Sequence, residues 1–298
     1  MKLHMNTLTR FMTRRRFFDR SVRITAGTLL GAAMAPLWAA PGSRRFRIGA
    51  CDWSIGKSDA TSFELAKRLG LDGVEVEMGS AEGRLPLRQP ERQRAYLEAA
   101  RQNGIAIASL AMGVFNNVAL KSEPVAALWL LDGIEVARAL GVKVILLACF
   151  GRGELKGDKA GLERVTELFR EAAPRAEKAG VILGFENYLS AEENLEVLEK
   201  VGSPALQVYY DVGNSTDKGY DIYREIRLLG KRICQFHFKD ARFLLGKGRI
   251  DFKKVREAMD DIEYSGWIHL EAAAPNGLMV DYPANLAFLR SLFPASPA

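Results

Sequence analysis

The 298-residue sequence predicts a single-domain (β/α)8 barrel that follows an N-terminal signal peptide. Three observations lead to this fold class. From residue 46 onward, short apolar or β-branched runs alternate with amphipathic helical stretches, eight such runs occur, and no linker or low-complexity tract separates them. Strands that alternate with helices form parallel sheets, and eight such units in about 250 residues is typical of a closed barrel.

Residues 1–39 have the pattern of a signal peptide. A basic segment, "TRRRFFD" (13–19), precedes an apolar run (24–38) and a small residue at the expected cleavage site, Ala39. The apolar run is shorter than the about 20 residues that span a membrane, although an uncleaved anchor or an ordinary secretion signal is the alternative. Arg14 and Arg15 resemble the pair of a twin-arginine export signal. This predicts export of the folded protein by the twin-arginine machinery, to the periplasm or beyond.

Composition limits the classes of partner. Residues 1–40 carry seven of the 42 Lys and Arg residues and one of the 36 acidic residues, so 35 of each remain in the predicted mature chain. The net charge of +6 therefore belongs to the leader, and nucleic acid is not an expected partner. Three cysteines without paired spacing argue against a disulfide scaffold and predict buried free thiols.

The predicted barrel extends over residues 46–293. Eight strands are expected, at 46–53, 73–78, 105–112, 142–150, 181–187, 206–214, 233–240 and 267–272. The clearest helices between them are expected at 61–69, 91–103, 122–140 and 158–179, the last interrupted by Pro174 and ended by Gly180. A doubly wound open sheet is the main alternative. It is disfavoured because "GACDWSIG", after the first strand, lacks the glycine fingerprint of a dinucleotide-binding turn.

Four consecutive predicted strands end in residues that can bind a metal. Glu186, Asp211, His237 and Glu271 stand at the ends of strands five to eight, and catalytic groups of a barrel come from this edge. Three converging carboxylates would repel one another, and a divalent cation would relieve this repulsion. An oxygen-rich set with one nitrogen favours Mn²⁺, Mg²⁺ or Co²⁺, while Zn²⁺ stays possible.

Three further residues are candidates for substrate binding. Lys239 has the strand parity of His237 and can face inward, although a solvated lysine at the rim is an equal alternative. Trp53 can offer an apolar wall to a sugar, with ordinary packing as the alternative. Glu75 and Glu77 share one face of the second strand, and Glu77 lies closer to the predicted rim.

The motifs around these residues resemble those of the xylose isomerase-like TIM barrels, a family of sugar phosphate isomerases and epimerases. The resemblance covers about residues 46–293 and rests on "GFEN", "YYDVGN", "FHFKD", "LGKGRIDF" and "IHLEA". It implies that Glu186, Asp211, His237 and Glu271 bind one divalent metal, and that Glu186 and Glu271 act as an acid/base pair.

The chain departs from the pattern of some ketose 3-epimerases within this family. Those enzymes carry a histidine three residues after the metal-binding aspartate, where this chain has Asn214. They also carry an arginine a few residues after the metal-binding histidine, whereas Arg242 is displaced from that place. Both residues are kept as substrate-binding candidates, and ketose 3-epimerase activity does not transfer directly.

The function predicted from the sequence is an exported, metal-dependent sugar isomerase or epimerase. It would transfer a proton through an enediolate, and export favours a non-phosphorylated sugar or keto-sugar as substrate. A 3-keto-glycoside lyase or hydratase that uses the same enediolate is the nearest alternative, and a non-catalytic sugar-binding barrel is the alternative of another class. Nothing in the sequence separates a monomer from a homo-oligomer.

Overall fold

The computed structural model describes residues 45–294. The predicted signal peptide, residues 1–39, lies outside the described residues, so the export prediction stays a prediction. Within residues 45–294, no helix is both long and apolar enough to cross a membrane.

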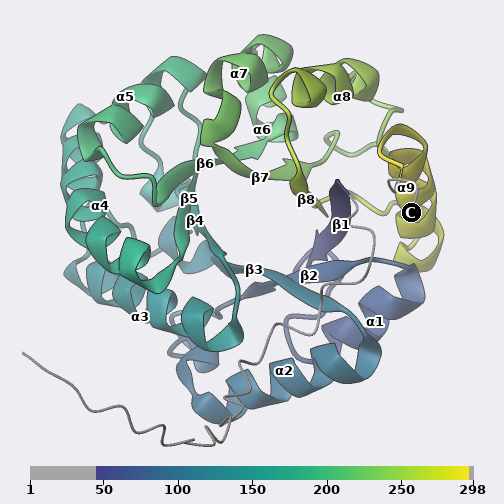
Figure 1. The fold of residues 1–298 in the computed structure, drawn as a ribbon, viewed down its shortest axis with the longest axis horizontal. Helices are drawn as coiled ribbons and strands as arrows, with labels where there is room; N and C mark the ends of the chain where they lie inside the picture. The colour runs from purple at the N-terminus through teal and green to yellow at the C-terminus, as the bar shows by residue number, and fades with distance from the viewer. Residues whose placement is uncertain (1–44, 295–298) are drawn as a thin grey trace, which may run out of the picture. The chain divides into compact units, whose positions relative to one another are not determined.

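The eight predicted strands form one closed parallel barrel in which each strand pairs with its neighbours in sequence, and the last pairs with the first (Figure 1). This confirms the predicted fold class. The strands are β1 (Phe46–Cys51), β2 (Gly73–Glu77), β3 (Ala106–Met112), β4 (Val144–Ala148), β5 (Ile182–Glu186), β6 (Leu206–Asp211), β7 (Ile233–Phe238) and β8 (Gly266–Leu270).

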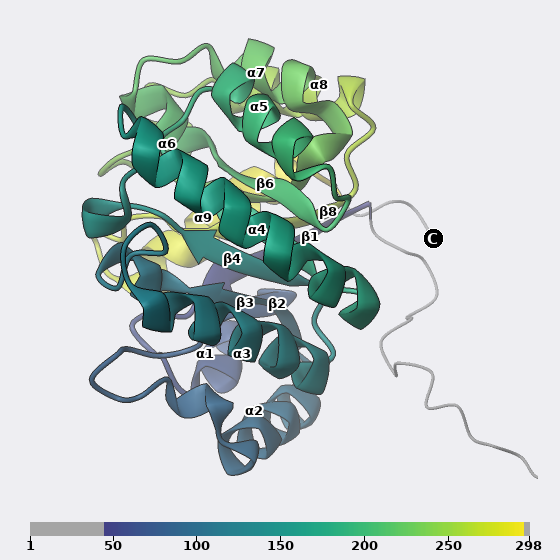
Figure 2. The same cartoon turned by 90° about the vertical axis from the view of Figure 1, so that its left-hand side faces the viewer.

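Helices surround this ring of strands on the outside (Figures 1 and 2). They are α1 (Ser62–Leu69), α2 (Pro90–Asn103), α3 (Pro124–Leu140), α4 (Lys159–Ala179), α5 (Ala191–Val201), α6 (Val212–Asp217), α7 (Ile222–Leu229), α8 (Phe252–Asp261) and α9 (Leu278–Leu292). The longer helices α3, α4 and α5 bury apolar residues against the sheet, as the 3.6-residue period of the sequence predicts.

Helix α4 shows where one local prediction was wrong. Gly180 ends the helix in a left-handed conformation, with φ 67°, as predicted. Pro174 does not interrupt it, and the helix continues from Lys159 to Ala179. Proline costs the helix one backbone donor, but Val165 and Phe169 of the same helix are fully buried. Packing of the apolar face against the sheet therefore outweighs the local preference.

Two apolar regions hold the barrel together. The larger one fills the space between strands and helices, and a smaller one lies inside the barrel around Ala111, Leu146 and Tyr209. Trp53 and Phe150 are half-buried and pack against the inner region. They mark the end of the barrel at which the strands terminate, and the polar strand ends meet there.

Candidate metal centre

The structure brings the four predicted ligands together. Each offers one ligand atom, and these atoms all lie within 4.8 Å of one another. Glu186 and Asp211 end β5 and β6, His237 lies in β7 opposite Asp211 in the strand pairing, and Glu271 directly follows β8. Parallel strands in register carry their carboxyl ends to one edge, which is why residues 85 positions apart in sequence meet here.

The two carboxylate oxygens of Asp211 make different contacts. Oδ1 accepts hydrogen bonds from the backbone N–H groups of Gly213 and Asn214, at 2.7 and 3.0 Å, and so caps helix α6. Oδ2 lies 2.7 Å from the Nζ atom of Lys239. The cap fixes the orientation of the carboxylate, so that Oδ2 faces the cluster.

The two ring nitrogens of His237 face different groups. Nδ1 lies 3.0 Å from Oε1 of Glu186 and 3.6 Å from Oε2 of Glu271. Nε2 lies 2.8 Å from Oε1 of Glu75 and 3.4 Å from the sulfur of Cys51. Nδ1 is therefore the nitrogen that the cluster can use as a ligand. The side chain of His237 is only 1% exposed.

Glu271 and Lys239 form the accessible side of the cluster. Their side chains are 23% and 22% exposed, whereas Glu186, Asp211 and His237 are buried. Lys239 donates to Oε2 of Glu271 at 2.6 Å, and the indole N–H of Trp53 donates to Oε1 at 3.0 Å. The predicted wall residue Trp53 thus also orients the carboxylate that a substrate would reach first.

Burial and the nearby cations shift the pKa values of the carboxyl groups in opposite directions. Burial raises the pKa of Glu186 and of Asp211, and the nearby cations His237 and Lys239 offset this only in part. Burial alone would also raise the pKa of Glu271, but His237 and Lys239 outweigh burial and lower it. Burial alone would lower the pKa of His237, yet Cys51, Glu186 and Glu75 raise it well above its usual value.

These residues fit one divalent cation. Two oxygen ligands of the same ion, each about 2.0–2.6 Å from it, can be no more than about 5 Å apart, and the four ligand atoms, which all lie within 4.8 Å of one another, meet this limit. A cationic group already lies between two of the carboxylates, because the Lys239 ammonium pairs with both Asp211 and Glu271. Three oxygen donors and one imidazole are suited to Mn²⁺, Mg²⁺, Co²⁺ or Zn²⁺.

The other predicted substrate-binding residues lie in different places. Asn214 is half-buried in the first turn of α6, next to the cluster through its bond to Asp211. Glu77 ends β2, where its carboxyl group accepts from the backbone N–H groups of Gly79 and Gly113. Burial and nearby Asp52 raise the pKa of Glu77 to about 8.

Arg242 is exposed, and its guanidinium lies 5.3 Å from the ring centre of Phe243. Among the described contacts, none joins Arg242 to the four ligands. The conformation of the loop after β7 explains the position of Arg242. Asp240 accepts hydrogen bonds from the backbone N–H groups of Gly248 and Arg249. This folds the loop after β7 onto itself and leaves Arg242 on the outside of it.

Sequence analysis did not identify the residues that hold the far side of His237. Glu75 is fully buried, and its Oε2 accepts from the hydroxyl groups of Ser109 and Tyr209, at 2.5 and 2.6 Å. Burial alone would raise the pKa of Glu75, but His237 outweighs it and lowers the pKa to about 2. The available signal was two glutamates on one face of β2. Cys51, Cys149 and Cys234 are free thiols, as predicted, but only Cys51 and Cys149 are buried, and Cys234 is half-buried.

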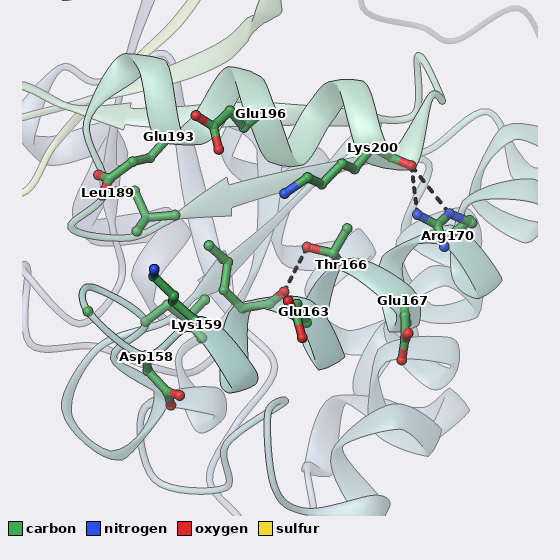
Figure 3. Close-up of a pocket in the computed structure, with 13 residues that line it drawn as sticks. Asp158, Lys159, Glu163, Thr166, Glu167, Arg170, Leu189, Glu193, Glu196 and Lys200 are labelled. Atoms are coloured by element: carbon green, nitrogen blue, oxygen red, sulfur yellow. Dashed lines mark hydrogen bonds between the residues drawn. The ribbon is translucent and has the colours of Figure 1, made fainter.

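A surface pocket of about 460 Å³ lies away from this cluster, between α4 and α5 on the outside of the barrel (Figure 3). Its walls carry side chains of both charges, such as Glu163, Arg170 and Lys200, and Arg170 donates to the backbone oxygen of Lys200 at 2.9 Å. None of the predicted site residues lines it. We assign the chemistry to the strand ends, because the convergent ligands lie there.

Comparison with known proteins places the fold and the motifs in context. A family model described as "Xylose isomerase-like TIM barrel" matches residues 63–292. The chain is 28% identical over 197 residues to 2-epi-5-epi-valiolone 7-phosphate 2-epimerase of Actinoplanes sp., covering 65% of this chain and 73% of the relative. It is 26% identical over 223 residues to L-ribulose-5-phosphate 3-epimerase UlaE of Escherichia coli K12, covering 68% and 78%.

Two solved structures show the same fold at lower identity. D-psicose 3-epimerase from Clostridium cellulolyticum H10 with D-tagatose is 21% identical, with a TM-score of 0.70, over 83% of this chain and 99% of that chain. The 3-keto-D-glucoside 4-epimerase YcjR from E. coli is 15% identical, with a TM-score of 0.71 and the same coverage. At these identities the likeness shows the shared barrel.

Proposed function

The chain belongs to the xylose isomerase-like TIM barrel family, and on that premise we propose that it is a divalent-metal-dependent sugar epimerase or isomerase. The observation that carries the proposal is the convergence of Glu186, Asp211, His237 and Glu271, whose ligand atoms lie within 4.8 Å of one another. The curated relatives are epimerases of sugar or cyclitol phosphates, which supports the reaction class.

Glu186, Asp211, Glu271 and Nδ1 of His237 would hold the metal. When bound, a divalent cation supplies Lewis acidity, which acidifies the C–H bond next to a sugar carbonyl and stabilises the enediolate. The proton chemistry belongs to the two glutamates. Glu271, the more exposed of the two, takes the proton from carbon while the C–H electron pair forms the enediolate, and Glu186 returns a proton to carbon.

The outcome depends on where the proton returns. Delivery to the opposite face of the same carbon gives an epimer, and delivery to the neighbouring carbon gives an isomer. Trp53 and Lys239 hold the carboxylate of Glu271 through its two oxygens, so that the base is oriented before the substrate arrives. A sugar-binding barrel without catalysis would not need a paired acid and base at this position.

We assign substrate contacts to the accessible side of the cluster. Lys239 can donate to a sugar oxygen, and the half-buried ring of Trp53 offers an apolar surface to a sugar face. Asn214 of α6 lies beside the cluster, because its backbone N–H donates to Asp211. Glu77 and Arg242 lie farther from the four ligands. They would contact only a larger substrate, or would need a loop movement to reach a small one.

The proposed export of the protein bears on which substrate it can meet. The leader, residues 1–39, directs export in our interpretation, and an exported enzyme meets free sugars more than sugar phosphates. We therefore propose a non-phosphorylated ketose or keto-glycoside as the substrate.

Incubation with ketoses and with 3-keto-glycosides in D₂O tests the reaction class. Deuterium incorporation at the carbon beside the carbonyl, with the aglycone retained, is the expected result for an epimerase. Release of the aglycone would assign the protein to the lyases instead. Glu271→Gln is expected to abolish incorporation, because it removes the base while keeping the shape of the side chain. Absence of incorporation across both substrate classes with Mn²⁺-loaded protein would contradict catalysis.

A further inference from the structure

A second layer of polar side chains lies inside the barrel beneath the four ligands. Glu75 of β2, Ser109 of β3, Tyr209 of β6 and His269 of β8 are each at most 1% exposed. Glu75 joins this layer to the ring of His237 on the side away from the ligands, because its Oε1 lies 2.8 Å from Nε2 of His237. Buried polar groups are costly unless they are hydrogen-bonded, so this layer needs an explanation.

The hydrogen bonds of this layer fix the direction of each proton. A carboxylate can only accept, so Ser109 and Tyr209 both donate to Oε2 of Glu75, at 2.5 and 2.6 Å. Tyr209 has one proton and uses it there. His269, whose Nδ1 lies 2.5 Å from the same hydroxyl oxygen, must therefore donate to it from Nδ1.

The same accounting applies to His237. Oε1 of Glu75 and Oε1 of Glu186 are both acceptors, so without metal the ring donates from both nitrogens when it is protonated. A cation held by the four ligands would take the place of the proton on Nδ1, which faces Glu186 at 3.0 Å, and would leave the proton on Nε2 bonded to Glu75. A bond from the second ring nitrogen to a carboxylate is the usual means by which proteins orient a histidine ligand.

We propose that Glu75 is a positioning residue of the metal centre, which holds Nε2–H of His237 so that Nδ1 is the ligand. Ser109 and Tyr209 fix the carboxylate of Glu75 in turn. The inference rests on the proposed metal function, because it assigns residues that act through one of the ligands. It also excludes a different use of the same atoms, in which Cys51, Glu75 and Nε2 of His237 would themselves bind the ion.

The chain offers a matched control for this layer. Tyr210, the next residue of β6, points to the opposite side of the sheet and donates to Oε2 of Glu225 at 2.8 Å. Glu225 is buried like Glu75, and its other oxygen accepts from the backbone N–H of Ala191 at 2.8 Å. The pairs Tyr209–Glu75 and Tyr210–Glu225 thus have similar chemistry, but only the first contacts a predicted ligand.

Mn²⁺ affinity of the full chain, measured by calorimetry, is the first test. Glu75→Gln is expected to weaken Mn²⁺ binding by about 10- to 100-fold, and Tyr209→Phe by about threefold to tenfold. Glu225→Gln and Tyr210→Phe are expected to change the affinity less than twofold. Thermal melts of the metal-free variants show whether each one is folded, and Tyr209→Phe keeps the test usable if Glu75→Gln does not fold.

The second readout is the tautomer of His237 in Mg²⁺- or Zn²⁺-loaded protein, from the ring nitrogen shifts in NMR spectra. Protonated Nε2 with metal on Nδ1 is the expected state. Unchanged Mn²⁺ affinity in both Glu75→Gln and Tyr209→Phe, or metal on Nε2, would overturn the positioning role alone. A wild-type protein that binds no divalent ion would overturn the proposed function as well.

Discussion

Lys239 is expected to be a built-in counter-cation of the site, and its replacement by methionine tests this quantitatively. Lys239→Met keeps most of the side-chain stem and removes the ammonium that lies 2.7 Å from Oδ2 of Asp211 and 2.6 Å from Oε2 of Glu271. The variant leaves three carboxylates facing one another with one cation fewer. Without metal, the folded state should lose stability, because unpaired buried charge is costly.

The size of the loss follows from burial. Removing one partner of a fully buried ion pair costs about 3–5 kcal/mol, and we take about 2–3 kcal/mol because the Lys239 side chain is 22% exposed. In a domain of this size, 1 kcal/mol shifts Tm by about 2–4 °C, so the metal-free variant should melt about 5–10 °C below the wild type. Bound Mn²⁺ restores positive charge, so the gap should shrink to about 3 °C or less at saturation.

Differential scanning calorimetry with and without Mn²⁺ measures both gaps. The increase in Tm on adding Mn²⁺ should be larger in Lys239→Met than in the wild type, and Mn²⁺ should bind the variant more tightly. Lys231→Met is the control, because Lys231 forms an ion pair with Glu263 in which both side chains are at least 80% exposed. It should shift Tm little. Equal metal-induced shifts in Lys239→Met and the wild type would refute the counter-cation reasoning.

Two further predictions concern the rim and the pH response. Trp53→Phe keeps an aromatic wall but removes the donor to Oε1 of Glu271, and steady-state rates should show kcat/KM lowered by about threefold to tenfold. Burial raises the pKa of Glu77 to about 8 and of Asp52 to about 7. The folded protein therefore holds protons that the unfolded chain has released, and the free energy of unfolding should fall from about pH 4.5 to 8. Urea titrations of metal-loaded protein across this range should give a shallower fall in Glu77→Gln, and a matching fall in both proteins would contradict the assignment.

The fold could be predicted from the sequence because its signals are local and repeated. Apolar runs and amphipathic stretches alternate eight times, and the parallel closure follows from that order. The same logic placed Glu186, Asp211, His237 and Glu271 at one edge, since strand ends of a parallel barrel share an edge. Where local signal and packing disagreed, as at Pro174, packing decided the structure.

The layer beneath the ligands could not be predicted, because its contacts depend on register. Glu75 meets Tyr209 and His237, which are 134 and 162 residues away in sequence. The strand pairing shifts between Val74 and Glu75, and again between Val208 and Tyr209. Such shifts change which residues share a layer of the barrel, and the sequence has no pattern that indicates them.

Loop conformation limited the prediction of substrate contacts in the same way. Lys239 follows β7 with the parity of His237, so its inward direction could be inferred, but its simultaneous pairing with Asp211 and Glu271 could not. Arg242 was placed by analogy with a motif. Its true position depends on how Asp240 folds the loop through Gly248 and Arg249, which is a matter of backbone hydrogen bonds.

An anomalous difference map from a crystal grown with Mn²⁺ tests the central claim most directly. The account predicts one peak about 2.0–2.4 Å from an oxygen of Glu186, Asp211 and Glu271 and from Nδ1 of His237. No peak at these four residues, or a peak beside Nε2 of His237 near Cys51, would contradict it.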